Sequence, residues 1–356
     1  MQSKRITPVF QALLAALLFG ASAPLSKLLL GEISPVLLAA FLYLGSGIGL
    51  LLVKLMGKVV YVESKEARLT RSDWPWLTGA ILAGGVIAPI TLMISLRHAP
   101  AATASLLLNF ECVTTTLIAA VVFKEAIGRR AWWAIVLITL ASILLSTDFT
   151  NKWGFSLSAL GVLAACFMWG LDNNLTRNIS AKDPLVIVTV KGLGAGLVSL
   201  MIAVALGSAF PPVSIILLSL LLGSLSYGLS IFLFVHAMRG LGAGRTSALF
   251  GTAPLAGILL SLIIFQESPG ILFAIALPIM AGGAYVLVME NHEHSHLHEV
   301  VVHDHSHSHT DNHHQHEHET ALVGRSHSHI HGHERMMHSH DHAPDIHHRH
   351  PHSEET

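Results

Sequence analysis

Residues 19–27, FGASAPLSK, and residues 169–177, WGLDNNLTR, are the two stretches that decide how this chain folds. Each lies inside an apolar run, begins with an aromatic residue followed by glycine, and ends with a basic residue, Lys27 or Arg177. The two stretches are 150 positions apart. This spacing predicts that one structural unit occurs twice along the chain.

Further matches repeat the same order of features in both halves of the chain. They pair Ser34-Pro35 with Asp183-Pro184, Leu96-Arg97 with Met238-Arg239, Ser105-Leu106 with Ser247-Ala248, and Phe123-Lys124-Glu125 with Phe265-Gln266-Glu267.

The composition places the repeated body in a lipid bilayer. Hydrophobic residues make up 52% of the chain and charged residues only 12%, which is unlike a soluble domain of this length. A bilayer core about 30 Å thick needs about 20 apolar residues of helix. Runs of about that length occur ten times, at residues 8–30, 35–55, 74–96, 99–123, 130–146, 155–176, 184–206, 213–238, 243–265 and 270–289. The first run has basic residues before it, like a secretion signal, but it continues to Leu30 and belongs to the repeat, so we expect it to be retained.

The fold class that follows is an all-α integral membrane protein. We predict ten transmembrane helices arranged as two inverted five-helix repeats, over residues 8–147 and 155–290, followed by a disordered tail over residues 291–356. The second repeat is inverted because a unit with an odd number of spans enters the membrane from the opposite side. Inverted repeats are typical of secondary transporters, whose substrate site lies near the midplane between the halves.

Basic residues predict the orientation of the chain in the membrane, because loops rich in Lys and Arg stay cytoplasmic. With the N-terminus inside, the even-numbered loops carry twelve of them, against three in the odd-numbered loops and span ends. We therefore expect a multi-pass protein of the cell inner (plasma) membrane with cytoplasmic N- and C-termini.

These motifs resemble the EamA-like transporter family of the drug/metabolite transporter superfamily, in the form with two EamA domains. The resemblance rests on the aromatic-glycine pairs, the small-residue stretches at 101–105 and 243–247, and the Phe-x-Glu motifs at 123–125 and 265–267. It implies an inner-membrane exporter of small solutes. The family's proline in the fourth helix of each repeat is present in the second half as Pro254, whereas Cys112 takes its place in the first half.

Polar residues at membrane depth are costly and therefore suggest function. Glu111 lies midway along the fourth span, close to Asn109. As a functional residue it would line the cavity, where it would bind a cationic group or take up and release a proton. The alternative is a structural carboxylate paired with a neighbouring helix.

A second polar group, Asp172, Asn173 and Asn174, follows Trp169 in the sixth span. Consecutive polar residues cannot share one helical face, so they predict either a weakened helix beside a cavity or hydrogen bonds that hold helices together. Lys191, in the seventh span, would receive a carboxylate substrate or form an ion pair with Glu111 or Asp172. The candidate substrate and coupling residues are Glu111, Asn109, Asp172, Asn173, Lys191 and Trp169.

Other residues in the spans have simpler interpretations. Cys112 and Cys166 lie in apolar runs and are expected to be buried packing residues. The glycine series at 45–49 and 192–196 are expected to permit close helix packing. His236 lies near a span end and His98 in a loop, and both are expected to be interfacial residues and not ligands.

The tail holds all histidines except those two, 23 of the 25 in the chain. Most occur at every second position, which places successive imidazoles on the same side of an extended segment. Neutral imidazole suits zinc, nickel, cobalt and copper, so we predict a divalent transition metal on the tail and no cofactor for transport. A pH-sensing segment and a low-complexity segment without a role are the alternatives. The candidate ligands are His292, His294, His296, His298, His303, His305, His307, His309, His313, His314, His316, His318, His327, His329, His331 and His333.

Three functional hypotheses follow. The first is an exporter of small organic metabolites, amino-acid-like or drug-like, with a metal-binding tail. The second is an exporter of divalent nickel, cobalt, zinc or a metal chelate, with the tail collecting the ion. The third is a membrane metal sensor that does not transport. The spans offer few soft ligands, which favours the first hypothesis. No catalytic motif predicts an enzyme.

The expected partners are the lipid bilayer and a small-molecule or metal substrate. Proton coupling and a homodimer are open hypotheses. A net charge of −1 and the lack of a basic, aromatic-rich stripe give no reason to expect nucleic acid.

Overall fold

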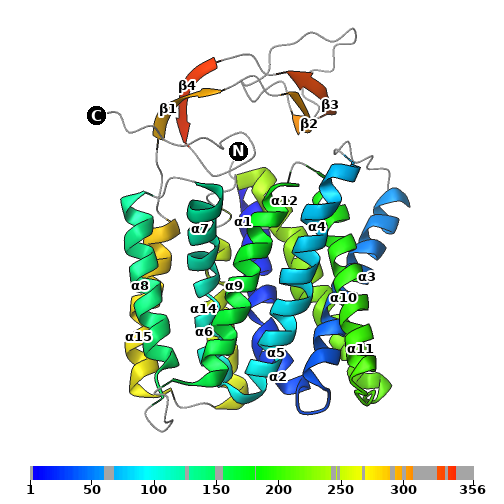
Figure 1. The fold of residues 1–356 in the computed structure, drawn as a ribbon, viewed down its shortest axis with the longest axis vertical. Coiled ribbons are helices and arrows are strands. Elements are labelled where there is room, and N and C mark those ends of the chain that lie inside the picture. Colours follow the sequence, from blue (N-terminus) through cyan, green and yellow to red (C-terminus); the bar gives the residue numbers. More distant parts are fainter. Residues whose placement is uncertain are drawn as a thin grey trace.

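The computed structural model describes most of the apolar body and four short segments of the tail. The described residues are 3–59, 68–124, 128–148, 155–180, 182–241, 246, 249–266, 269–288, 293–298, 302–307, 327–332 and 336–341. In the body, the helices run side by side along one direction (Figure 1).

The first repeat is built from helices that are often broken within a span. Its elements are α1 (Ser3–Gly20), α2 (Ser22–Leu29), α3 (Pro35–Val59), η1 (Arg71–Asp73), α4 (Trp74–Ala80), η2 (Ile81–Ile87), α5 (Ala88–His98), α6 (Ala101–Leu107), α7 (Phe110–Phe123) and α8 (Arg129–Ser146).

The second repeat has the same order of spans. Its elements are α9 (Leu157–Arg177), α10 (Pro184–Ala205), α11 (Val213–Gly223), η3 (Ser224–Leu229), α12 (Ser230–Leu241), α14 (Ala253–Phe265) and α15 (Ile271–Val288).

The helices confirm the predicted all-α membrane fold. Within the described residues, seven helical stretches are long and apolar enough to cross a membrane, and α14 and α15 are shorter apolar helices. The remaining span is α9, which has 21 residues. The polar residues at positions 172–174 lower its mean hydropathy below that of the other spans.

Two local features recur at equivalent positions and support the internal repeat. The third span of each repeat contains a π-helical turn, η2 in the first and η3 in the second. The fourth span of each repeat ends on a residue with a left-handed backbone, Lys124 (φ 55°) and Gln266 (φ 49°). Both residues are the middle position of the Phe-x-Glu motif, so this motif marks the end of a helix.

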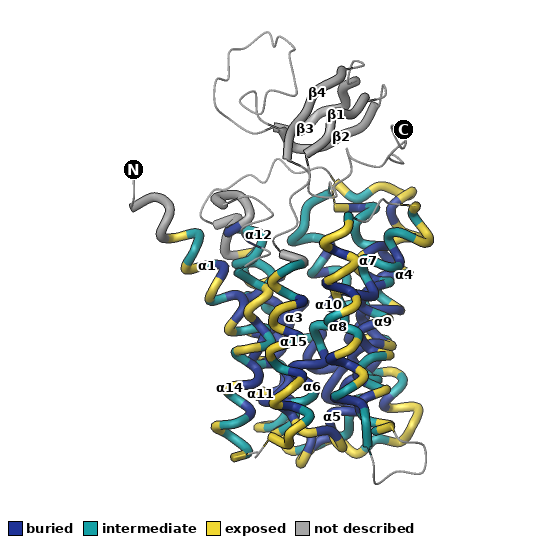
Figure 2. Tube along the Cα trace, turned by 90° about the vertical axis from the view of Figure 1, so that its left-hand side faces the viewer, coloured by how far each residue is buried: buried dark blue, intermediate teal, exposed yellow. Residues whose placement is uncertain are grey.

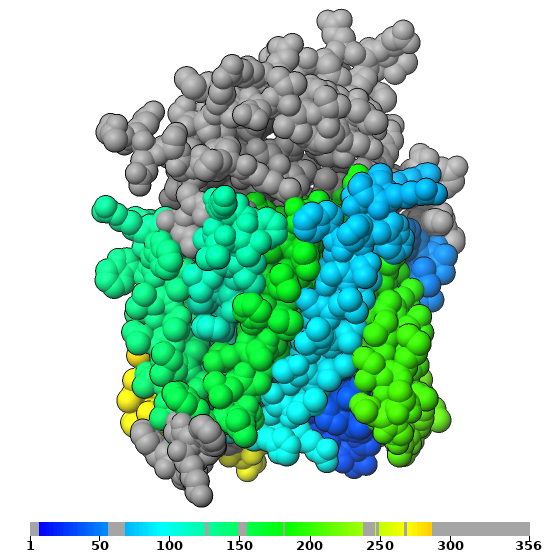
Figure 3. Space-filling model, in the orientation of Figure 1, coloured from blue at the N-terminus to red at the C-terminus, as the bar shows by residue number. Residues whose placement is uncertain are grey.

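The two repeats are interleaved. Helix α1 packs against α12, η3 and α14 of the second repeat, and α9 packs against α4, η2, α5 and α7 of the first. Figure 3 shows α9 (green) between α8 (teal) and the cyan span of α4 and α5. Helix α3 pairs with α10, and α8 pairs with α15.

The glycines of the aromatic-glycine pairs lie where these helices cross. A Cβ on Gly20 would lie 2.1 Å from the carbonyl oxygen of Ala253, and a Cβ on Gly170 would lie 2.8 Å from the backbone nitrogen of Thr115. Only glycine permits such a close backbone approach. The glycine series of α3 and α10 act in the same way, since a Cβ on Gly192 would lie 2.7 Å from the backbone nitrogen of Gly47.

The large apolar side chains lie on the outside of the bundle and small residues fill much of its interior. Exposed positions follow the outer surfaces of the helices (Figure 2), and they include Leu259 and Ile263 of α14. Because lipid is as apolar as a protein core, such residues are stable at this surface. Cys166 is buried as expected, but Cys112 is exposed, which differs from the expectation that both pack in the interior.

Part of the tail forms strands, which differs from the expectation of a wholly disordered segment. Strand β1 (Glu293–His298) pairs antiparallel with β4 (Met336–Asp341), and β2 (Val302–His307) pairs antiparallel with β3 (His327–Gly332). Histidine alternates with other residues in these segments, and alternation with a period of two is compatible with a strand.

Candidate functional site

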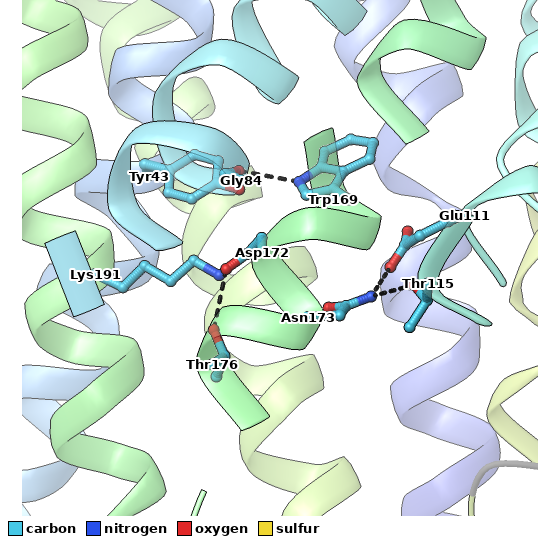
Figure 4. A network of polar contacts seen from close by, with 9 residues as sticks. All are labelled: Tyr43, Gly84, Glu111, Thr115, Trp169, Asp172, Asn173, Thr176 and Lys191. Atoms are coloured by element: carbon cyan, nitrogen blue, oxygen red, sulfur yellow. Dashed lines mark hydrogen bonds and ion pairs between the residues drawn. The ribbon is translucent and has the colours of Figure 1, made fainter. Parts of the chain in front are cut away.

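The polar residues of α9 lie at the centre of a network that joins five spans, counting α9 itself (Figure 4). Asp172 is 2% exposed and forms an ion pair with Lys191 of α10. Its other carboxylate oxygen, Oδ1, accepts a hydrogen bond of 3.0 Å from the Thr176 hydroxyl, one turn further along α9. A buried carboxylate needs such partners. The structure therefore pairs Lys191 with Asp172, one of the two partners considered for it.

A free backbone carbonyl lies beside this ion pair. In η2 the N–H of Ala88 donates to Ala83, five residues earlier, so it does not reach Gly84. The next residue, Pro89, has no N–H. The Gly84 oxygen accepts instead from the Tyr43 hydroxyl at 2.6 Å and from Trp169 Nε1 at 3.0 Å.

Gly84 also touches the buried carboxylate. A Cβ at this position would lie 1.9 Å from Asp172 Oδ2. The π-helical turn therefore places a carbonyl that lacks a helical N–H partner beside a charged pair, and the hydrogen bonds from Tyr43 and Trp169 to this carbonyl join α3 and α9 to the turn.

Glu111 is the second carboxylate of the site. Its Oε1 atom accepts a hydrogen bond of 2.8 Å from Asn173 Nδ2, and the same amide donates to the Thr115 hydroxyl at 3.1 Å. Among the residues that the structure describes, no cation lies within ion-pair distance of Glu111. Glu111 is partly exposed, and its hydrogen bond from Asn173 of α9 places it where the two repeats meet.

Helix α9 stays regular through its three polar residues, so the predicted weakening of this helix is wrong. The reason is that each side chain has a partner. Asp172 faces α10, whereas Asn173 and Asn174 face α7, and Asn174 Nδ2 donates to the carbonyl oxygens of Thr115 at 3.0 Å and Gly170 at 2.8 Å. The alternative expectation, that these residues hold helices together, describes Asn174.

Asn109 does not join the network. It lies at the break between α6 and α7, and its amide donates to the Leu106 carbonyl oxygen at 3.2 Å. His236 makes local contacts, with Nδ1 3.2 Å from the Phe232 carbonyl oxygen, and His98 is an exposed residue in the last turn of α5.

Aromatic residues from both repeats meet near the two carboxylates. The Tyr43 and Tyr227 rings have centroids 5.7 Å apart, and Phe19 lies 5.9 Å from Tyr227. Phe19 belongs to the aromatic-glycine pair of the first repeat, as Trp169 does to that of the second. Aromatic residues of both repeats therefore lie against one another where the two halves meet.

The two carboxylates have different partners. Lys191 forms an ion pair with Asp172, whereas among the described residues the hydrogen-bond partner of the Glu111 carboxylate is the neutral Asn173 amide. Such a carboxylate can hold a proton or the ammonium group of a ligand. Within the described spans, no group of three or more His, Cys, Asp or Glu is placed to hold a metal ion.

The sequence did not single out Tyr43, Gly84, Thr115 and Thr176 as site residues. Thr115 and Thr176 follow Glu111 and Asp172 by four residues, which is one helical turn. The sequence does contain a signal for Gly84. In a π-helical turn its carbonyl oxygen would accept a hydrogen bond from the residue five positions later, but that residue is Pro89, which has no N–H. No local pattern points to Tyr43.

The predicted metal ligands of the tail divide into two groups. His294, His296, His298, His303, His305, His307, His327, His329 and His331 lie in the strands, whereas His292, His309, His313, His314, His316, His318 and His333 lie outside the described residues. The strand register places His303 opposite His331 and His305 opposite His329. In the other sheet, His294 is opposite His340 and His296 is opposite His338.

Comparison with known proteins agrees with this architecture. An uncharacterized transporter of Methanothermobacter thermautotrophicus is 30% identical over 298 residues, which cover 80% of this chain and 87% of that protein. A protein of known crystal structure is similar with a TM-score of 0.56 and 21% identity, over 78% of this chain and 94% of that one. At this level of identity the likeness concerns the fold alone.

The family model of EamA-like transporters matches the chain twice, over residues 6–147 and 156–289. The two matches coincide with the two interleaved repeats, and together they cover most of the chain. The protein therefore belongs to the EamA-like transporter family and has two EamA domains.

Proposed function

We propose that this transporter exports small organic solutes, amino-acid-like or drug-like, that carry an ammonium group. The observation that carries the proposal is Glu111, whose carboxylate accepts a hydrogen bond from the neutral Asn173 amide and has no ion-pair partner among the described residues. A carboxylate without a counterion favours a cationic group over an anion. Aromatic faces, such as those of Tyr43 and Tyr227, add cation–π attraction.

Proton coupling belongs to the same proposal. Glu111 can hold either a proton or the substrate ammonium, so binding of one releases the other. Exchange of protons for substrate then drives export across the inner membrane. The orientation with cytoplasmic termini, which the basic loops favour, places the tail on the side from which substrate is taken up.

The test is uptake of a panel of radiolabelled amines and amino acids into inverted membrane vesicles with an imposed proton gradient. We expect Glu111→Gln to abolish uptake and substrate-induced proton release while leaving the amount of folded protein unchanged. Glu32→Gln is the matched control, because Glu32 is an exposed residue in the α2–α3 connection. Wild-type flux in Glu111→Gln would remove this carboxylate from the mechanism.

A metal-binding role of the tail is the second candidate. It is supported by the strand register, which sets histidines opposite each other in both sheets. In this proposal the tail buffers or senses cytoplasmic zinc, nickel, cobalt or copper.

Cells that express the full chain, a version stopped after Met289, or Glu111→Gln distinguish the two roles. If the tail buffers metal and the spans carry an organic solute, cellular metal content will follow the tail and ignore Glu111. If Glu111→Gln abolishes a metal efflux that the wild type shows, the substrate is the metal or a metal chelate instead.

A further inference from the structure

A group of basic and aromatic side chains lies on the outside of the bundle where α7 ends and α8 begins, at the upper end in Figure 1. We call it the basic-aromatic patch, and its members are all exposed: Lys124, Arg129, Arg130, Trp132 and Trp133. Trp132 is 50% exposed and Trp133 is 68% exposed. Figure 3 shows α8 (teal) at the left edge of the bundle. The patch therefore faces the surroundings of the protein and not its interior.

Helix α8 is held in the bundle by a different face. Its buried residues are spaced as one side of a helix, and they include Ala131, Ala134, Ile138 and Ala141. The main neighbour of α8 is α15, which approaches so closely that a Cβ on Gly283 would lie 2.8 Å from Ile138 Cγ1. The attachment of α8 to the bundle therefore uses a face that contains none of the patch residues.

The second repeat shows which residues the fold requires at the positions of the patch. Aligned on the Phe-x-Glu motifs, Arg129-Arg130-Ala131-Trp132-Trp133 corresponds to Ile271-Leu272-Phe273-Ala274-Ile275 at the start of α15. Ile271 and Ile275 are exposed, as their counterparts in α8 are. Apolar residues are thus sufficient for an outward-facing start of the fifth span. The basic and aromatic residues of α8 have a role that the fold does not require.

The orientation of the chain in the membrane does not depend on the patch alone. Basic residues in short loops keep those loops cytoplasmic, and ten of the twelve in the even-numbered loops lie outside Arg129 and Arg130. Tryptophan rings at a membrane interface lie at the level of the lipid headgroups. Two exposed tryptophans directly after two exposed arginines therefore indicate contact with a headgroup.

An apolar stripe continues from the patch toward the centre of the membrane. On α8 it consists of Val136, Leu140 and Ile143, which are exposed and three or four residues apart. On the last turn of α7, Val121 and Val122 are also exposed. The surface thus presents positive charge, then indole rings, then hydrocarbon. A phospholipid presents its phosphate, glycerol and acyl chains in the same order.

We propose that the basic-aromatic patch binds an anionic phospholipid. Arg129 and Arg130 hold the phosphate, because guanidinium groups donate paired hydrogen bonds to phosphate oxygens, and Lys124 adds positive charge. The indole rings lie beside the glycerol, and the acyl chains lie along the apolar stripe. Basic residues beside a span attract the anionic lipids of a cytoplasmic leaflet, and the basic loops predict that this end of the bundle is cytoplasmic.

Native mass spectrometry of the full chain, released from detergent micelles, tests this binding. Phosphatidylglycerol and phosphatidylcholine with the same acyl chains are titrated separately, and the bound lipid is counted. One basic residue beside an anionic headgroup is worth about fivefold in affinity, so the three should favour phosphatidylglycerol on the order of 100-fold. The double variant Arg129→Gln, Arg130→Gln should keep a preference of only about fivefold.

Two further variants serve as controls. Arg97→Gln removes an exposed arginine at the opposite end, in the last turn of α5, and should leave the preference unchanged. Arg129→Lys with Arg130→Lys keeps both charges and should retain most of the preference. If the double glutamine variant does not fold, the wild type supplies the test. Raising ammonium acetate from about 0.1 M to about 1 M shortens the Debye length to about 3 Å and should remove most of the preference.

Four results would overturn the proposal. The first is equal affinity of the wild type for the two lipids, and the second is an unchanged preference in the double glutamine variant or at high salt. The third is that glycerophosphoglycerol, the headgroup without acyl chains, binds as tightly as the lipid, which would make the patch a site for soluble phosphate compounds. The fourth is a dimer that the double variant dissociates without any change in lipid binding. Amine transport and its loss in Glu111→Gln are separate readouts, so the two proposals fail independently.

Discussion

Removal of the Lys191 ammonium should destabilise the protein by leaving the Asp172 carboxylate buried without a counterion. The side chain of Asp172 is 4% exposed and that of Lys191 is 18% exposed, so water can hydrate the carboxylate only slightly. Breaking a buried ion pair from one side costs about 3–5 kcal/mol. The hydrogen bond from Thr176 remains and offsets part of this loss. We therefore expect Lys191→Ala to cost about 3 kcal/mol.

The assay is thermal unfolding of the purified protein in detergent, followed by tryptophan fluorescence. For a domain of this size, about 3 kcal/mol corresponds to a melting temperature lower by about 6–12 °C. The double variant Asp172→Asn, Lys191→Met removes both charges and should recover most of the loss. The control is Lys182→Ala, because Lys182 and Asp73 are 3.9 Å apart and the Asp73 carboxylate keeps two hydrogen bonds from Thr70 when the lysine is removed. There the loss should stay near 1 kcal/mol.

Two results would contradict this expectation. One is that Lys191→Ala has the melting temperature of the wild type, and the other is that the double variant is no more stable than Lys191→Ala. Either result would mean that Asp172 does not depend on Lys191 for its charge balance.

Three further predictions concern the network and the tail. Gly84→Ala should lower the free energy of unfolding by about 1–3 kcal/mol, because the added Cβ would collide with Asp172. Gly282→Ala is the control and should be neutral, since nothing lies within 4 Å of the position of its Cβ. Thermal unfolding compares the two variants, and equal melting temperatures would contradict the collision. Tyr43→Phe should lower the free energy of unfolding by about 1 kcal/mol, because it removes one of the two hydrogen-bond donors to the Gly84 carbonyl. An unchanged melting temperature would show that water or Trp169 compensates for the lost hydrogen bond. In equilibrium dialysis, the full chain should bind zinc or nickel and should release the metal on mild acidification, because the imidazoles gain protons. A chain stopped after Met289 should bind none. Equal binding by both chains would place the metal in the spans.

The fold was largely predictable from local sequence. The ten apolar runs predicted the spans because a helix that faces lipid must satisfy its backbone internally, whatever its neighbours. The aromatic-glycine pairs and the Phe-x-Glu motifs predicted the repeat. Their physical reason became visible in the structure, as close crossings at Gly20 and Gly170 and as left-handed helix ends at Lys124 and Gln266.

The candidate site was only partly predictable. The free-energy cost of placing a charged side chain at membrane depth was enough to select Glu111, Asp172 and Lys191 from the sequence. The same argument selected Asn109, which makes only a local hydrogen bond. Polarity alone does not say which way a side chain points at a helix break.

The sequence by itself determined the membrane class, the number of spans, the repeat and the identities of the charged residues, because each depends on composition or spacing along one segment. Only the tertiary structure decided that Lys191 pairs with Asp172 and not with Glu111, and that Tyr43 and Trp169 meet on the Gly84 carbonyl. Trp169 and Gly84 are 85 positions apart. Their contact depends on the distances and angles at which the interleaved helices cross. Many small residues, distributed over both repeats, determine that geometry jointly.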